Sequence, residues 1–430
     1  MSASAGWGAW LRRAGTPLLA VLPQWLVARA VVLGALALAR LVTDRAHVTG
    51  PGAVARVHQG LLGWDAGWYK AIATFGYVPL GHQSFRFFPL VPLAARALSQ
   101  LPGVTPGAAL LVVANGCSLV ATALFYVLVR RESGDVDLSR RAVWLLCLVP
   151  PAFVFVMGYA EATLLLFCVA CFLAIRPTPV TRVLARHHRA PGGLGPPIGP
   201  GAASVADPAT RPSPLGAPPA GGPAPVPVAG WVAAAVFGVA AALTRPLGVV
   251  LVVAVAIEAV RAWPQSTTGQ RVAAVVATVA PVGGLLAFLG WSRAATGDFF
   301  LPLRVQSQAG HHGGLSNPLS TLSHDASGAL HHHLGTALHV PWVILVVALL
   351  VVCWRRWPAS YGAFATAVVV LALAGSNLDS FERYALSAFP LVMTGATLIS
   401  GVRVSRVVLT LSAAGLGAYA LMAFFNILVP

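Results

Sequence analysis

The stretch AVWLLCLVPPAFVFVMGYAEATLLLFCVACFLAI, residues 142–175, decides how this chain is organised. Its 34 residues are almost entirely apolar, which is too many for one bilayer crossing of about 20 residues and slightly few for two. Glu161 stands inside the run, where a single crossing would bury an ionised carboxylate in the bilayer at a cost of at least about 2.5–3.5 kcal/mol. We therefore predict a helical hairpin with Glu161 at its turn.

A second long run, residues 229–260, repeats this pattern around Arg245 and predicts another hairpin. Further apolar runs each fit one crossing, at residues 17–42, 108–129, 272–291, 340–354, 359–374, 385–400 and 407–428. Together they predict an all-α polytopic membrane protein with about eleven transmembrane helices. With the N-terminus in the cytoplasm and the C-terminus outside, most arginines fall in cytoplasmic loops, as the positive-inside rule requires.

The composition agrees with a membrane protein and excludes a soluble one. Hydrophobic residues make up 57% of the chain and charged residues 9%, whereas about 25% is usual in globular proteins. The net charge of +16 comes from arginines in short pairs between apolar runs, not from a basic face with aromatic residues, so we expect no nucleic-acid partner. The cysteines lie in or beside apolar runs and predict neither a disulfide nor a metal site.

The chain divides into two membrane halves joined by a linker. Residues 1–175 form the N-terminal half and include a first external loop at 43–107. Residues 176–228 are rich in proline and glycine and lack apolar periodicity, which predicts a disordered cytoplasmic linker. Residues 229–430 form the C-terminal half, with an external loop at 292–339.

In this topology, polar residues from separate segments gather on the external face. The first external loop contains Asp65, the two hairpin turns carry Glu161 and Arg245, and the last external loop carries Arg383 and Tyr384. Ionisable groups that converge at one bilayer face indicate a polar site at the membrane boundary. We therefore expect an active or binding site on the external face.

Asp65 is the leading catalytic candidate. Trp64, Trp68 and Tyr69 flank it, and such rings prefer the headgroup level, so they would hold the aspartate at the interface. A carboxylate there can accept a proton from a sugar or lipid hydroxyl as a general base. The same pattern fits an interfacial anchor helix whose aspartate merely faces water. Residues 84–101 predict a second, amphipathic helix in the same loop.

The arginines and histidines of the external side allow two interpretations each. Arg245 and Arg383 could bind a phosphate through bidentate contacts, or could simply extend to the lipid headgroups from helix ends. Histidines crowd the 292–339 loop, but their spacing matches no zinc motif and predicts a solvated tract; they are His311, His312, His324, His331, His332, His333 and His339. No metal ligand is expected.

The motifs resemble those of the PIG-V family, the second mannosyltransferase of GPI-anchor assembly and its bacterial homologues. The segment WDAGWYKAIATFGY at 64–77, followed by FFPLVPL at 87–93, is similar to the family signature WDxxWYxxIAxxGY…FFPLxPL. Shorter matches follow in order: YAE at 159–161, TRPLG at 244–248, GD at 297–298, RY at 383–384 and FPL at 389–391. Around the GD block the chain departs from the family, with Phe299 and a histidine-rich stretch.

This resemblance implies a GT-C-type glycosyltransferase with an interfacial helix in its first external loop. It implies transfer of mannose from a polyprenyl-phosphate donor to a lipid-linked or glycan acceptor, with Asp65 as base and Arg245 or Arg383 stabilising the leaving phosphate. We expect substrate contacts from Trp64, Trp68, Tyr69, Glu161, Arg245, Arg383 and Tyr384. The implied protein is a multi-pass plasma-membrane enzyme surrounded by membrane lipids, with no cofactor beyond the lipid-phosphate donor and no metal requirement.

Two other classes remain open at the level of the sequence. A polytopic transporter or lipid flippase would also combine many helices with scattered polar groups, although such proteins often show repeated halves and broken helices at the membrane midplane. A purely structural membrane protein would fit the composition as well. Sugar transfer by the purified protein separates all three.

Overall fold

A computed structural model describes residues 3–45, 51–176, 226–308, 316–317, 320–321, 339–375, 378 and 380–428. For residues 3–15 and 51 it describes the backbone only. The described chain is almost entirely helical. Most of the proposed linker (residues 177–225), most of the histidine-rich tract and the polar residues Asn377 and Asp379 lie outside the described residues.

Most of the bundle consists of apolar helices of 10 to 43 residues. They are α1 (Ala3–Arg45), α5 (Pro106–Ser133), α6 (Val136–Leu148), α7 (Glu161–Ile175), α8 (Val228–Thr244), α9 (Leu251–Ala262), α10 (Thr268–Thr296), α14 (His339–Arg356), α15 (Ala359–Leu373), α17 (Phe389–Leu398) and α18 (Val402–Phe424). The remaining helices are short: α2 (Pro51–Gln59), η1 (Gly60–Leu62), α3 (Asp65–Phe75), η2 (Val78–Leu80), η3 (His82–Arg86), α4 (Leu90–Leu98), η4 (Pro150–Phe155), η5 (Pro246–Val250), η6 (Trp263–Gln265), α11 (Leu301–Gln306) and α16 (Phe381–Leu386).

Six described helical segments are long and apolar enough to cross a membrane by length and composition: 16–45, 106–133, 246–265, 268–296, 339–356 and 402–424. The apolar helices α7, α8, α15 and α17 are shorter, with 10–17 residues. Each apolar run of the sequence does contain a helix, but the expected count of about eleven full spans is not shown. The fold is that of a multi-pass helical membrane protein.

Both long apolar runs divide into two helices, as the buried charges inside them require. In the first run α6 ends before Pro150, and the chain passes through η4 and a turn before α7 begins at Glu161. Proline lacks the backbone N–H that an uninterrupted helix needs. In the second run α8 ends at Thr244 and Arg245 adopts an extended conformation. A Cβ added to Gly248 would lie 2.2 Å from the backbone of Ala241, so only glycine allows this tight reversal.

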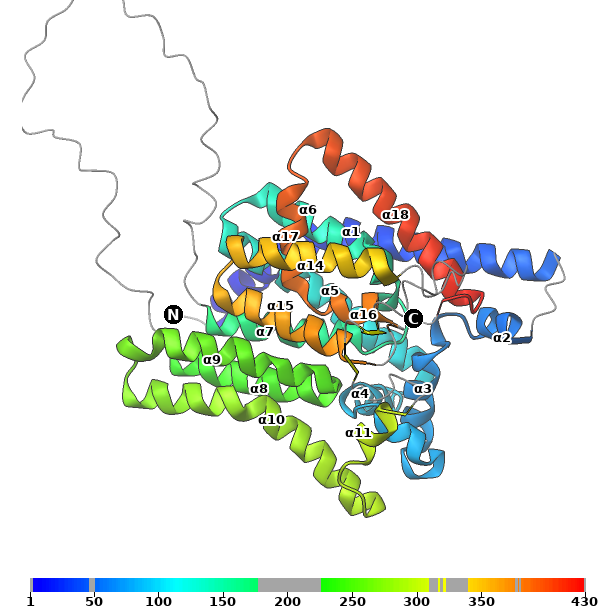
Figure 1. Cartoon of the computed structure of the whole chain (residues 1–430), viewed down its shortest axis with the longest axis horizontal. Coiled ribbons are helices and arrows are strands. Elements are labelled where there is room, and N and C mark those ends of the chain that lie inside the picture. Colours follow the sequence, from blue (N-terminus) through cyan, green and yellow to red (C-terminus); the bar gives the residue numbers. More distant parts are fainter. Residues whose placement is uncertain are drawn as a thin grey trace, which may run out of the picture.

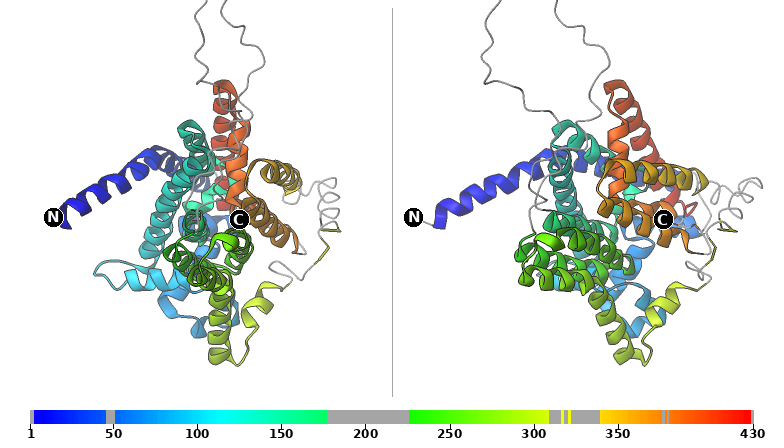
Figure 2. Two further views of the ribbon diagram at one scale, coloured as in Figure 1. Left: turned by 90° about the vertical axis from the view of Figure 1, so that its left-hand side faces the viewer. Right: turned by 60° about the vertical axis from the view of Figure 1, so that its left-hand side comes forward.

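The helices α7, α8, α9, α14 and α15 run in roughly the same direction (Figure 1), and two further views show the bundle from other sides (Figure 2). Helix α5 packs against α1, α6 and α7, while α8 packs between α7 and α10. The short helices α2, α3, α4 and α11 gather at one end of the bundle (Figure 1). We refer to this as the Asp65 end.

The first external loop does not contain the single amphipathic helix expected over residues 84–101. Instead η3 ends at Arg86, Phe87 is extended, and α4 begins only after Pro89. Proline disfavours a helical conformation in the residue before it, which explains the break at Phe88–Pro89. Asp65 does begin a helix, α3, but the placement of α3 and α4 at a membrane interface remains a prediction.

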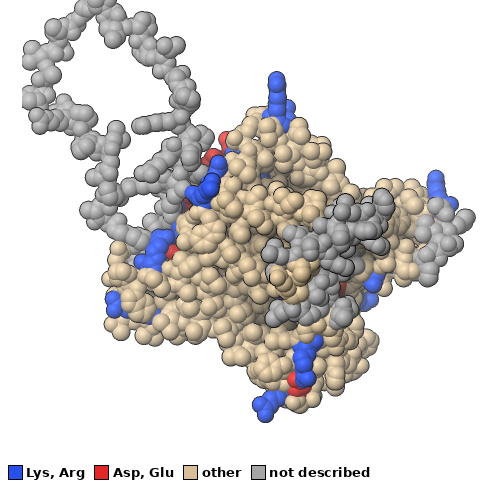
Figure 3. All heavy atoms as spheres, viewed as in Figure 1, with Lys and Arg blue, Asp and Glu red and all other residues tan. Residues whose placement is uncertain are grey.

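Charged side chains lie toward the edges of the molecule in the view of Figure 3, and the middle of the visible described surface carries none. Arg176 is an exception, because it was expected in a cytoplasmic loop and is instead buried where α7 ends. Its guanidinium binds Glu132 of α5 through two contacts, at 2.7 and 3.0 Å, and Glu258 of α9 at 2.6 Å. Ser360 of α15 donates to the same Glu258 oxygen. These residues, named here the Arg176 cluster, join both halves of the chain.

Candidate functional site

Asp65 is the first residue of α3, and the residue before it fixes the start of that helix. Trp64 has a positive φ of 56°, which side-chain-bearing residues seldom adopt, and its indole Nε1 donates to the carbonyl of Ala423 at 3.0 Å. The C-terminal end of α18 thus holds the turn in place. A carboxylate at a helix N-terminus is stabilised by the helix dipole.

Arg383 is the centre of the site, because it contacts both acidic residues that the sequence singled out. Its Nη1 donates to Asp65 Oδ2 at 2.7 Å, and its Nε lies 3.2 Å from Glu161 Oε1 in an ion pair. The Arg383 side chain is only 6% exposed, so solvent screens these contacts weakly. Residues 318 positions apart are thereby brought into one ion network.

Arg245 completes the network from the second hairpin. Its guanidinium pairs with the same Glu161 oxygen and also donates to the Tyr384 hydroxyl at 3.3 Å. Arg383 donates to that hydroxyl at 2.9 Å, so Tyr384 bridges the two arginines. Close packing at Gly158 positions Glu161, because an added Cβ there would lie 2.9 Å from Leu110. The predicted residues Asp65, Glu161, Arg245, Arg383 and Tyr384 therefore lie together.

Arg86 is a member of this site that the sequence analysis did not select. It stands at the end of η3, and its Nη2 lies 3.7 Å from Asp65 Oδ1, the oxygen that Arg383 does not bind. The sequence predicted a helix over 84–101, which placed Arg86 on a surface that guides a lipid tail or packs against the protein, so a role beside Asp65 was not expected. Arg86 stands three residues before Pro89 in the segment FRFFPLVP, and nothing in that pattern distinguishes a site residue from a surface arginine.

The site holds three arginines against two carboxylates. Burial raises the pKa of Asp65, but the charges of Arg383, Arg86 and Arg245 lower it further, and the net result is a pKa below the usual value. Burial also raises the pKa of Tyr69. Asp65 is therefore ionised at neutral pH, and among the described side chains of the site the guanidinium groups outnumber the carboxyl groups by one.

The aromatic residues predicted to bind substrate have different surroundings. Trp68 stacks on Phe87 with ring centroids 5.7 Å apart, and Tyr69 meets the same ring edge-on at 5.1 Å. Trp64 packs under the guanidinium of Arg56, 4.0 Å from its ring centroid. Tyr69 is affected by the charges of the site, whereas the contacts of Trp64 and Trp68 support the loop around it.

Arg29 fastens the hairpin that carries Glu161, and the sequence analysis assigned it no role. This arginine lies in α1 and is 8% exposed. Its Nη2 donates to Ser118 at 2.8 Å and to the Phe155 carbonyl at 2.9 Å, and its Nε donates to Asn115. An arginine in the middle of an apolar run costs free energy unless it is paired, and that is the signal that could have revealed it.

Of the seven histidines expected in a solvated tract, the structure describes His339, and there the expectation is wrong. It was expected in a solvated stretch, but it is buried, and its Nδ1 lies 2.7 Å from Glu382 Oε1. The other histidines of the tract lie outside the described residues. Among described residues, no three histidine, cysteine or acidic side chains form a group that could hold a metal ion. The expected independence from metal remains a prediction.

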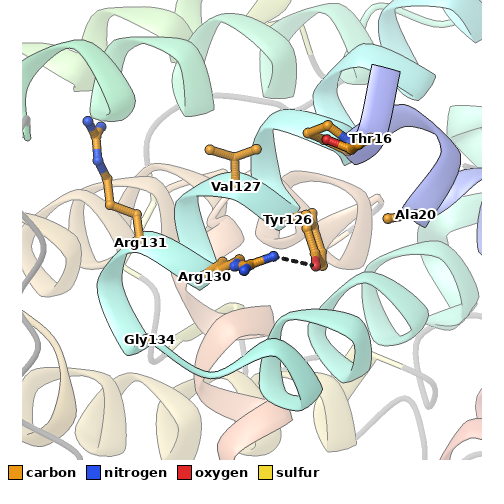
Figure 4. A pocket seen from close by; sticks show the side chains of 8 residues that line it. Thr16, Ala20, Tyr126, Val127, Arg130, Arg131 and Gly134 are labelled. Carbon is orange, nitrogen blue, oxygen red and sulfur yellow. Dashed lines mark hydrogen bonds between the residues drawn. The ribbon is translucent and has the colours of Figure 1, made fainter. Parts of the chain in front are cut away.

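A separate cavity of about 530 Å³ lies between the start of α1 and the end of α5, lined by residues that include Tyr126 and Arg130 (Figure 4). Arg130 points toward Tyr126, whose hydroxyl it contacts at 3.4 Å. Gly107, near the start of α5, packs against Leu62 beside α3. The helix rises about 1.5 Å per residue, so roughly 35 Å separates this cavity from the Asp65 end. It does not belong to the site.

Comparisons with known proteins leave the family open. No family model matches the chain, and no curated protein matches it. Among solved structures, the chain is similar to the Archaeoglobus fulgidus oligosaccharyltransferase crystallised in complex with Zn and sulfate, with 12% identity and a TM-score of 0.38. The match covers 84% of this chain and 48% of the archaeal one, so this chain spans about half of that protein's length. A likeness this distant carries no conclusion about the reaction, and the PIG-V resemblance remains a prediction.

Proposed function

We propose that this protein is an integral-membrane glycosyltransferase that moves a sugar from a lipid-phosphate donor to an acceptor hydroxyl at the Asp65 end of the bundle. The donor is a polyprenyl-phosphate sugar and the sugar is mannose, as the motifs imply. The Asp65 end faces the outside of the plasma membrane and the N-terminus faces the cytoplasm. The observation that carries the proposal is Arg383, which connects a lone aspartate to a second, arginine-rich ion pair.

The reaction is a single displacement at the anomeric carbon. The acceptor oxygen forms a bond to that carbon, and the bond between the carbon and the phosphate oxygen breaks. The electron pair of the broken bond leaves with the lipid phosphate. The acceptor proton passes to the Asp65 carboxylate, which acts as general base. Atoms and charge balance without any further reactant.

Three arginines can stabilise the negative charge of the site first on Asp65 and then on the leaving phosphate. Before transfer, Arg383 and Arg86 contact the ionised Asp65. When Asp65 takes the acceptor proton, its negative charge disappears, and these guanidinium groups become available to the phosphate, which gains a charge at the same moment. Fixed cations aimed at a developing anion stabilise a transition state strongly. Arg245 holds the other side of the phosphate.

Binding of the donor also prepares Asp65 as a base. In the free protein the arginines depress the pKa of Asp65, and a carboxylate with a depressed pKa is a weak base. A bound phosphate neutralises part of that positive charge, so the pKa of Asp65 rises when the substrate is present. The site thus becomes most basic when a donor is bound.

The direct test is sugar transfer by the purified protein. The protein is reconstituted in lipid and incubated with polyprenyl-phosphate sugars that carry labelled mannose, glucose or arabinose, together with membrane-lipid extract as acceptor. We expect label to enter a new lipid or glycan product with mannose as donor. Transfer with another sugar would correct the donor assignment. Movement of intact donor across the bilayer without any product would instead identify a flippase.

A further inference from the structure

An apolar cavity of about 450 Å³ lies beside the site; Glu382, Ala385 and Leu386 of α16 line it, and Arg383 does not. Helices α6, α14, α17 and α18 form its walls, and its lining includes Leu145, Leu349, Leu391, Leu398 and Leu411. Its size falls within the usual range for small-molecule pockets. Leu398 and Leu411 are 47% and 66% exposed, so the cavity opens through the side of the bundle, where we place the bilayer.

The cavity is elongated, because its lining follows α17 from Leu391 to the end of that helix. Leu391 stands near the start of α17 and Leu398 at its end, and the seven helical steps between them extend about 10 Å. An elongated apolar cavity open to the bilayer fits a hydrocarbon chain. What distinguishes it from an ordinary lipid contact is the polar group at one end.

Glu382 is that polar group. Among the described residues that line the cavity, it is the only charged one. Glu382 is 4% exposed and its Oε1 lies 2.7 Å from Nδ1 of His339. A carboxylate accepts hydrogen bonds from a hydroxyl group, and in its ionised form it has no donor to offer an anion.

Glu382 also connects the cavity to the reaction site. It directly precedes Arg383 in α16, so the Cα atoms of the two residues are about 3.8 Å apart. Arg383 contacts Asp65, while Glu382 lines the cavity. A molecule with its chain in the cavity and its head at Glu382 therefore has that head at the border of the Asp65 site.

We propose that this cavity binds the acceptor, and that the acceptor is a membrane lipid with free hydroxyl groups on an uncharged headgroup. The role of this lipid as acceptor rests on the proposed function, whereas its binding in the cavity does not. Charge argues against the donor as the occupant: its phosphate would lie beside Glu382, and the described lining residues include no lysine or arginine, whereas Arg383 and the other arginines that suit a phosphate belong to the Asp65 site.

Trp342 provides a binding assay that needs no catalysis, because it also lines the cavity. Parent and Trp342→Phe are measured in nanodiscs of unbrominated phosphatidylcholine, and the fluorescence of the variant is subtracted from that of the parent to give the signal of Trp342. Two probes share one 9,10-dibromostearoyl chain, which quenches indole on contact: the monoacylglycerol has a hydroxyl headgroup, and the lysophosphatidic acid has a phosphate. We expect the monoacylglycerol to quench Trp342 at a mole fraction at least about tenfold lower.

Filling the cavity gives the matched control. Gly395→Leu and Ser412→Leu add side chains to two different walls, and Val347→Leu makes the same type of change on the lipid-facing side of α14. The two filling variants should lose the selective quenching, and Val347→Leu should keep it. Quenching by the phosphate lipid at equal or lower mole fraction, or retention of selectivity in both filling variants, would overturn the binding.

Transfer kinetics then test the acceptor role. In the filling variants the KM for a long-chain hydroxyl lipid should rise about tenfold or more, while the KM for the polyprenyl-phosphate donor stays within twofold of the parent. A rise in the donor KM instead would overturn the assignment of the cavity. If the parent transfers no sugar at all, the proposed function and the acceptor role fail, and the quenching contrast still decides which lipid the cavity binds.

Discussion

Asp65 is held between two guanidinium groups, one on each carboxylate oxygen, and this arrangement predicts a pH effect at Arg86. Because the cations lower the pKa of Asp65, removing one of them raises that pKa. In Arg86→Gln the acid limb of the pH profile of kcat/KM should therefore move to higher pH. The other groups that influence Asp65, or are influenced by it, remain in the variant: Arg245, Arg383, Glu161, Tyr69 and Tyr159.

The control for this shift is Arg140→Gln, which removes an arginine that is 61% exposed and pairs with Asp137 at the start of α6. Its profile should coincide with that of the parent. An unmoved acid limb in Arg86→Gln, with transfer otherwise intact, would show that Arg86 does not act on Asp65.

The phosphate-binding role of arginine predicts that lysine cannot replace Arg245 or Arg383. Each guanidinium makes contacts in two directions, Arg245 to Glu161 and Tyr384, and Arg383 to Asp65 and Tyr384. A lysine ammonium keeps the charge but lacks the planar fork. We expect Arg245→Lys and Arg383→Lys to lower kcat/KM by about tenfold or more. This loss should be smaller than the loss of about 10²–10³-fold that removing a stabilising donor altogether causes.

Two results would contradict this account of the arginines. Parental rates in both lysine variants would favour side chains that merely extend to the headgroups. Loss of activity after thorough chelation, with recovery on added Mg²⁺ or Mn²⁺, would show that a metal ion holds the phosphate. Activity that survives chelation agrees with the arginine assignment.

Single residues were predictable from the sequence where a charge had no local reason to be present. This was the case for four residues with apolar or aromatic neighbours: Asp65, Glu161, Arg245 and Arg383. A charged side chain in a membrane costs free energy, so each of them indicated a special role. That Arg383 contacts both Asp65 and Glu161 could not be predicted, because it depends on how α16 packs against α14, α15 and η4. Arg86 was missed because the local break at Phe87 was not recognised.

At the scale of helices, the Arg176 cluster joins α5, α7, α9 and α15 and predicts a large loss of stability when its cation is removed. The Arg176 and Glu132 side chains are 1% and 0% exposed. Arg176→Met leaves two buried carboxylates without their main partner, and breaking a buried pair in this way costs about 3–5 kcal/mol. Thermal unfolding of the purified protein in detergent should show a clear fall in the midpoint.

Arg261→Met is the matched comparison for this prediction. Arg261 contacts the same Glu258 at 3.5 Å, but its side chain is 40% exposed, so its pair contributes at most about 1 kcal/mol. Its unfolding midpoint should lie close to that of the parent. Equal midpoints for Arg176→Met and the parent would mean that the cluster does not hold the two halves together.

The elements show why some boundaries could be predicted and others could not. The division of residues 142–175 and 229–260 followed from length and from one charge in each, because a bilayer penalises both an overlong run and a buried ion. The exact number of spans did not follow, since α7, α15 and α17 are shorter than a full crossing. Packing against neighbouring helices decides how such helices lie, and apolar composition does not report it.

For the whole molecule, the topology predicts which segments face the cytoplasm. A cysteine at Gly201 in the proposed linker should resist an impermeant thiol reagent in intact cells, and a cysteine at His324 should react. Both positions lie outside the described residues, so labelling tests the prediction independently of the structure. The background should carry Cys117→Ser, because Cys117 is the one native cysteine that is not fully buried. Labelling at Gly201 would contradict the predicted eleven-helix topology and its orientation.

The proposed reaction depends most directly on Asp65, and its conversion to asparagine is the measurement that tests the account. Asp65→Asn keeps the size of the side chain and a hydrogen-bond acceptor for Arg383 but removes the basic carboxylate. Transfer of labelled mannose from polyprenyl phosphate is measured in single turnover, with equal amounts of folded protein and with donor binding determined separately. We predict donor binding close to that of the parent and a transfer rate lower by about 10²–10⁴-fold. Transfer at the parental rate would show that Asp65 is not the base, and would contradict the mechanism.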